Sequence, residues 1–137
     1  MQISRSGDNM VLKFDSKENL FENLKDALKD SGCGWAVLVG IGMLKNAEIG
    51  YFDGDTYQKT LLKKPHELVA LHGTVTTQDA FTPHLHCGLV GPDFILKGGH
   101  LFSADVEVVC EMILVRLDTR MTRKEDPSTG LKLLELK

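Results

Sequence analysis

The chain has 137 residues, of which 42% are hydrophobic and 26% are charged, and its formal net charge at pH 7 is −3. This length and composition suit one folded globular domain and exclude a disordered or collagen-like chain. An acidic chain without a run of lysines or arginines has no general attraction for phosphate backbones, so direct DNA binding is possible but not favoured. No uncharged apolar run approaches the roughly 20 residues that span a bilayer, and the first residues hold no apolar signal region, so we expect a cytoplasmic protein without membrane contact.

The first predicted element is an amphipathic helix of about fifteen residues near the N-terminus. The segment ENLFENLKDALKDSG, residues 18–32, has apolar residues at helical spacing and charged residues on its other face. Asp15 and Glu18 have the spacing of a capping box, and Gly32 stands where a helix-ending glycine belongs.

The rest of the chain reads as strands. The segment WAVLVGIGML predicts a central strand with bends or close backbone contacts at Gly40 and Gly42. AEIGYF and TYQKTLL predict a hairpin around Asp53-Gly54, and HELVALHGTVT, HLHCGLVG and DVEVVCEMILVRL predict three further strands. TRKEDPSTG is typical of a mobile polar loop, and LKLLELK of a last strand or short helix.

One helix and about seven closely linked strands predict an α+β fold, in which a single domain has a largely antiparallel sheet and the helix lies near the N-terminus. We expect this domain to cover residues 1–137, with a core over about residues 8–118 and a polar loop over about residues 118–130. The odd number and wide spacing of Cys33, Cys87 and Cys110 predict buried free thiols rather than disulfides.

Three histidines fall in the segment PHLHCGLVGPDFILKGGHLF, residues 83–102. On a strand, His84 and His86 project to the same face about 6.5–7 Å apart, so both can bind one ion. Gly98-Gly99 permits a tight turn or a close backbone approach that brings His100 to the same face. Three imidazoles with one open position suit an accessible zinc site.

The residues alone leave two interpretations open. A His-x-His strand can equally carry two half-exposed polar residues, and no fourth ligand can be identified by spacing. The residues that follow His86 fit neither the glutamate of a cupin site nor the HxHxDH pattern of metallo-β-lactamases.

The remaining histidines and motifs point to no second site. His66 and His72 lie roughly 20 Å apart on one predicted strand, so they cannot share an ion unless the strand bends sharply. We interpret His72 as a packed or interface residue, with a place in the lining of the site as the alternative. The sequence contains no GxSxG nucleophile elbow, phosphate loop or dinucleotide fingerprint.

The order of these motifs resembles the plant and prokaryote conserved (PPC) domain family over nearly the whole chain. The resemblance rests on the amphipathic helix, on VGIGMLKNAEIGYFD, on HELVALHGTVT and on HLHCGLVGPDFILKGGHLFSADVEVVCEMIL. The last block is the most specific, because it combines HxH with Gly-Gly-His-Leu and a long strand.

The resemblance implies an antiparallel sheet flanked by helices, a homotrimer, and a metal site that carries over onto His84, His86 and His100. Zinc is the expected metal, because three neutral imidazoles suit it without a redox demand. Plant members join the domain to an AT-hook that reads the DNA minor groove, and this sequence lacks the Arg-Gly-Arg-Pro core of that hook. His72 departs from the small polar residue usual in relatives.

The resemblance leaves the biochemical role open between three hypotheses. The first is a metal-binding homotrimer, with metal-assisted hydrolase or lyase chemistry conceivable and Glu111, then Glu107, as candidate acids. The second is a DNA-associated regulatory protein that acts through partners or weak direct DNA binding. The third is a trimeric scaffold whose histidines only hydrogen-bond across subunits.

Overall fold

The computed structural model describes residues 1–29, 31–77, 80–119 and 121–136. Its elements in chain order are β1 (Gln2–Ser6), β2 (Asn9–Asp15), α1 (Leu20–Lys29), β3 (Trp35–Phe52), β4 (Tyr57–Leu62), β5 (His66–Thr76), β6 (Thr82–Val90), β7 (Leu96–Leu117), β8 (Met121–Glu125) and β9 (Lys132–Leu136). All the strand pairings among these elements are antiparallel. The prediction of a single, largely antiparallel domain is therefore confirmed. Because the helix takes up only 8% of the described residues and strands take up 67%, the α+β class is only loosely supported.

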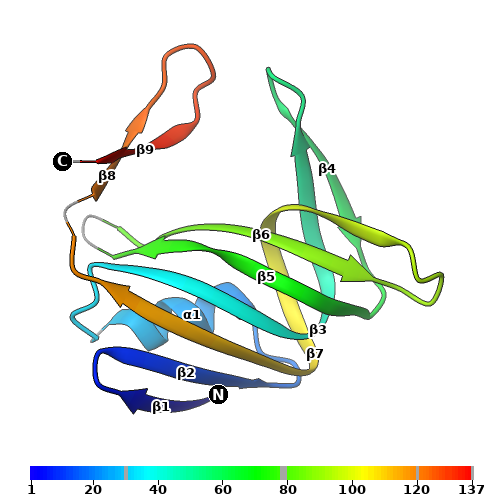
Figure 1. Ribbon diagram of the computed structural model, residues 1–137. Coiled ribbons are helices and arrows are strands. Elements are labelled where there is room, and N and C mark those ends of the chain that lie inside the picture. Colours follow the sequence, from blue (N-terminus) through cyan, green and yellow to red (C-terminus); the bar gives the residue numbers. More distant parts are fainter. Residues whose placement is uncertain (30, 78–79, 120, 137) are drawn as a thin grey trace.

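The two longest strands, β3 and β7, hold the sheet together. β3 pairs with β5, β5 with β6, β6 with β7, and β7 pairs again with β3, so the pairings close a ring. Both long strands bend along their length (Figure 1), and their register with one another shifts between Gly42 and Leu44 and again near Glu48. Because of these bends, each long strand pairs with different neighbours along its length. The C-terminal half of β7 also pairs with β2, which carries β1 at the edge of the sheet.

The core lies between one face of this sheet and α1 (Figure 1). Alternate residues of β2 (Met10, Leu12 and Phe14) are buried, as the period of a strand with one covered face requires. The helix buries Leu20, Leu24, Ala27 and Leu28, so its predicted apolar face is confirmed. All three cysteines are buried and free, as the sequence predicted.

The helix begins later and is shorter than the sequence suggested. The Oδ1 atom of Asn19 accepts hydrogen bonds from the backbone N–H groups of Phe21 and Glu22 at 3.2 and 3.1 Å, so Asn19 is the N-cap. The predicted capping box of Asp15 and Glu18 is therefore wrong as a helix start, although Glu18 does accept a hydrogen bond from the Asp15 backbone N–H. Asp30, Arg120 and Lys137, which the predictions also covered, lie outside the described residues.

Three elements differ from the sequence-based prediction. The hairpin β1–β2 precedes the helix, where no strand was predicted. The two segments predicted around Gly42 and Gly50 form one continuous strand, β3. Part of the predicted polar loop is strand β8, which pairs with β9. No helix in the described part of the chain has the length and apolarity needed to cross a bilayer.

Candidate metal centre

Three histidines converge where β6 and β7 pair. His84 and His86 are two residues apart on β6, so they project to the same face. His86 stands directly opposite His100 of β7 in the strand register, which brings the third imidazole to that face. The cluster predicted from the sequence is therefore present as a spatial group of side chains.

The imidazoles are close enough to share one ion. Their ring centroids lie 5.3 Å apart for His84 and His86, 5.3 Å for His84 and His100, and 5.5 Å for His86 and His100. One nitrogen from each ring can be chosen so that all three lie within 4.8 Å of one another. A tetrahedral zinc ion with bonds of 2.0–2.1 Å holds its nitrogens about 3.3 Å apart, so only small side-chain rotations separate the two arrangements.

Two glycines let the strands that carry these histidines approach their neighbours. Gly99 precedes His100 with φ of 149°, and a Cβ atom there would lie 2.4 Å from the backbone oxygen of Gly50 on β3. Gly73 of β5 has φ of 155°, and a Cβ atom there would lie 2.0 Å from the backbone oxygen of His84. The Gly-Gly pair before His100 therefore serves a close backbone approach rather than a turn.

The surroundings keep two of the imidazoles neutral. Burial, followed by the nearby His84 and His86, lowers the pKa of His100 to about 4. His84 is exposed as a whole residue, yet partial burial of its ring, followed by Arg123 and His86, also lowers its pKa. Only the neutral imidazole offers a lone pair to a metal, so these shifts favour metal binding at neutral pH.

The donor set fits a divalent transition metal. The Nδ1 atom of His100 is buried and has no hydrogen-bond partner among the described residues. An unpaired buried polar atom costs free energy, and a bond to a metal would remove that cost. Three imidazole nitrogens match an accessible zinc site that keeps one position for water or another ligand. The rings of Tyr57 and Phe102 pack on His100, with centroids at 5.3 and 4.5 Å, and shield that side of the cluster.

Arg123 is the residue near the cluster that sequence reasoning missed. It lies on β8, and its Nη2 atom is 3.5 Å from the Nδ1 atom of His84. The hairpin that carries it is held to the domain by a hydrogen bond from the Trp35 indole N–H to the Met121 backbone oxygen, at 3.0 Å. The sequence signal was the turn DPSTG: the carboxylate of Asp126 accepts hydrogen bonds from the hydroxyl groups of Ser128 and Thr129, which closes a hairpin rather than a loose loop.

The other candidate residues lie elsewhere. Glu107 and Glu111 stand seven and eleven residues beyond His100 on β7, where each residue adds about 3.3 Å. Glu107 forms an ion pair of 2.5 Å with Lys45, and Glu111 lines a different hollow. His72 pairs with His86 in the β5–β6 register but is not part of the three-histidine group. The structure therefore brings neither glutamate to the histidines.

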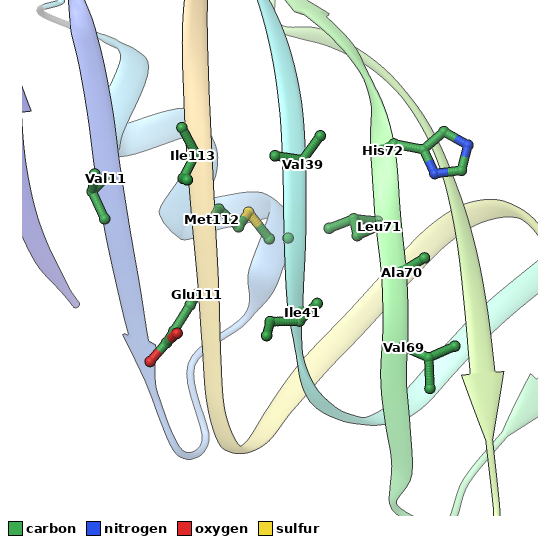
Figure 2. A pocket seen from close by; sticks show the side chains of 11 residues that line it. Val11, Val39, Ile41, Val69, Ala70, Leu71, His72, Glu111, Met112 and Ile113 are labelled. Atoms are coloured by element: carbon green, nitrogen blue, oxygen red, sulfur yellow. The ribbon is translucent and has the colours of Figure 1, made fainter.

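One face of the sheet is exposed and apolar. The exposed side chains that make up this outer face are Val11, Val37, Val39, Ile41, Val69, Ile113 and Val115. Five of them line a hollow of about 500 Å³ across β2, β7, β3 and β5, together with His72 and Glu111 (Figure 2). A contiguous apolar face of this kind marks an interaction surface more often than a free one.

Comparisons with known proteins agree with this architecture. A family model described as the Plants and Prokaryotes Conserved (PCC) domain matches residues 1–118. No curated protein matches the sequence at a significant level.

Solved structures match over almost the whole chain. A plant- and prokaryote-conserved (PPC) protein of Pyrococcus horikoshii is 31% identical, with a TM-score of 0.83 over 98% of this chain and 93% of its own. A protein of Archaeoglobus fulgidus described as metal-containing is 32% identical, with a TM-score of 0.83 over 96% and 94% of the two chains. A protein of Bacteroides thetaiotaomicron described as a candidate DNA-binding protein has a TM-score of 0.91 over 98% and 96%, but at 20% identity this likeness shows the fold alone.

Proposed function

The chain belongs to the Plants and Prokaryotes Conserved domain family, and from that membership we propose that it is a stand-alone member that binds a divalent transition metal and assembles as a homotrimer. His84, His86 and His100 are the proposed ligands, and zinc is the proposed metal.

The convergence of the three imidazoles is the observation that carries the metal site. They come from two strands, their nitrogens lie within 4.8 Å of one another, and the buried His100 Nδ1 atom has no partner among the described residues. The Archaeoglobus fulgidus relative described as metal-containing supports the same assignment. When bound in such a site, zinc can polarise a carbonyl or lower the pKa of a bound water.

The chain's own residues set what this site can do. The low pKa of His100 keeps its ring neutral, the rings of Tyr57 and Phe102 pack against it, and Arg123 places a positive charge beside His84. Neither Glu107 nor Glu111 is near enough to move a proton there, so the proposal includes no general acid or base from these two residues.

The outer face supports the homotrimer. Its valine and isoleucine side chains, such as Val39 and Ile41, are 46% and 57% exposed in the single chain. Burial of such a face against further copies removes apolar area from water, which stabilises an assembly by about 25 cal/mol for each Å² buried. A ring of three identical subunits is a common closed symmetry for this kind of interface.

Metal analysis tests the proposal directly. Protein purified without added metal is measured by mass spectrometry for transition metals, alongside His84→Ala, His86→Ala and a matched control, His72→Ala. We expect about one zinc ion per chain in the wild type and in the control, and strong loss in the other two variants. A wild-type chain with only trace metal, or metal content unchanged by His84→Ala, would refute the metal site.

A further inference from the structure

A hollow of about 180 Å³ opens beside the three-histidine cluster, between β6 and the β8–β9 hairpin. His84 and His100 line it from the cluster, and Arg123 and Lys132 line it from the hairpin. Its other lining residues are neutral, and within the described part of the chain no Asp or Glu lines it. The hollow therefore presents two basic side chains and no acidic one.

Among the residues that the structure describes, Arg123 has no acidic partner for its charge, since no Asp or Glu forms an ion pair with it. Its polar contacts are the Lys132 backbone oxygen at 3.1 Å, the Thr74 hydroxyl at 2.8 Å and the His84 Nδ1 atom at 3.5 Å. Its Nε atom is buried, and no described residue forms a hydrogen bond with it. A partly buried cation in this state gains free energy from a nearby anion.

The position of the guanidinium is fixed by the fold. It lies 5.6 Å from the centre of the Trp35 ring, which favours a cation over its face, and the hydrogen bond to Thr74 ties it to β5. The planar fork of an arginine matches the oxygens of a carboxylate or phosphate group, and such charge-assisted hydrogen bonds are among the strongest in proteins.

We infer that this hollow binds a small oxyanion, a carboxylate or phosphate group of a small molecule, against the Arg123 guanidinium and beside His84 and His100. The inference rests on the proposed metal site, because three zinc ligands from the protein leave a position that an oxygen of the anion can take. Arg123 would then act as a ligand-binding residue, and the oxyanion would be the group by which the chain recognises its small-molecule partner.

Titration with two probes tests the inference. The protein is loaded with cobalt, whose visible spectrum changes when an anion joins the metal, and is titrated with inorganic phosphate and separately with malonate. Wild type is compared with Arg123→Gln, with Arg123→Lys, which keeps the charge without the fork, and with Arg5→Gln, which removes an exposed arginine from β1. Metal content and melting temperature are measured for every variant first.

We expect saturable binding of at least one probe by the wild type and by Arg5→Gln, about tenfold to hundredfold weaker binding by Arg123→Gln, and a smaller loss for Arg123→Lys. Tighter binding of phosphate than malonate would point to a phosphoryl ligand, and the reverse to a carboxylate ligand. Equal affinities of wild type and Arg123→Gln at full metal content would overturn the inference and leave the metal site standing.

Failure of the metal site itself gives a different result. If the wild type takes up no cobalt or zinc, the proposed function fails. The anion site is then tested by NMR on the metal-free protein. A shift of the Arg123 Nε–H resonance on addition of phosphate would support the anion site, and an unmoved resonance would overturn it.

Discussion

At the scale of single residues, His100 is the member of the cluster most affected by its surroundings. Partial burial, followed by the neighbouring His84 and His86, disfavours its protonation. An imidazole kept neutral in this way is ready to bind a metal, but it also makes folding sensitive to acid. The same desolvation that suits the site therefore weakens the metal-free protein at low pH.

The direction of this effect follows from proton binding. The pKa of His100 is about 4 in the folded chain and about 6.5 in an unfolded one. Between these values the unfolded state binds more protons, so the free energy of unfolding falls as the pH falls. We expect metal-free wild type to lose stability from pH 6.5 to pH 4 more steeply than His100→Gln, measured by urea unfolding at several pH values. Parallel pH dependences of the two proteins would contradict a lowered pKa.

At the scale of elements, the site depends on how closely β3 approaches β7. His100 pairs with Gly50 of β3 on one side and with His86 of β6 on the other. Gly99, next to His100, has no room for a side chain, because the atom it would meet is a backbone oxygen that cannot rotate away. The position of the third histidine is thus fixed by backbone packing rather than by its own side chain.

Gly99→Ala should therefore damage both stability and metal binding. The Cβ atom would force β7 away from β3 and displace His100, at a cost of about 1–3 kcal/mol or more in the free energy of unfolding. Gly54→Ala is the matched control, because Gly54 also has a positive φ, of 107°, but nothing lies within 4 Å of the added Cβ. Urea unfolding and zinc competition with a coloured chelator measure the two effects. Unchanged zinc affinity in Gly99→Ala would show that the close approach is not needed for the site.

The elements also show what the sequence could predict. Strand parity placed His84 and His86 on one face, and the glycines before His100 indicated a tight turn or a close backbone approach, because both are local properties of the chain. The ring of pairings could not be predicted, since it depends on which distant strands become neighbours. Arg123 was missed because the polar composition of its segment resembled a loop, although Asp126 supplies the turn that makes it a hairpin.

At the scale of the whole molecule, the two faces of the sheet have different uses. The inner face is covered by α1 and forms the core, whereas the outer face exposes valine and isoleucine side chains across four strands. Glu111, predicted as a candidate acid, lies in this outer face rather than at the histidines. The metal site and the proposed trimer contact therefore occupy separate regions of β7.

A charge in the outer face should prevent assembly. Ile41→Glu places a carboxylate where we propose that subunits meet, and we expect a shift from trimer to monomer in size-exclusion chromatography with light scattering, because a buried unpaired charge is very costly. Ile3→Glu is the matched control. Ile3 is 44% exposed, but it pairs with the buried Leu12 and so lies on the inner face of the sheet, away from the outer face. A wild type that is monomeric at every concentration would contradict the homotrimer.

The acidic charge of the chain leads to a prediction about DNA. With a net charge of −3, we expect no binding of a labelled duplex in fluorescence anisotropy at low salt. Binding that strengthens steeply as the salt concentration falls would contradict this, because release of counterions from the DNA backbone gives that dependence.

The ring of strand pairings also affects the rate at which the protein folds. The contact that closes the ring joins Gly50 to His100, fifty residues later in the chain. To form such a distant contact, the chain loses conformational entropy before the packing of side chains compensates for it. The histidines on β6 and β7 are held in place only after that contact has formed. We therefore expect zinc to slow the unfolding of this protein while leaving its refolding rate unchanged, as stopped-flow kinetics with and without the metal would measure.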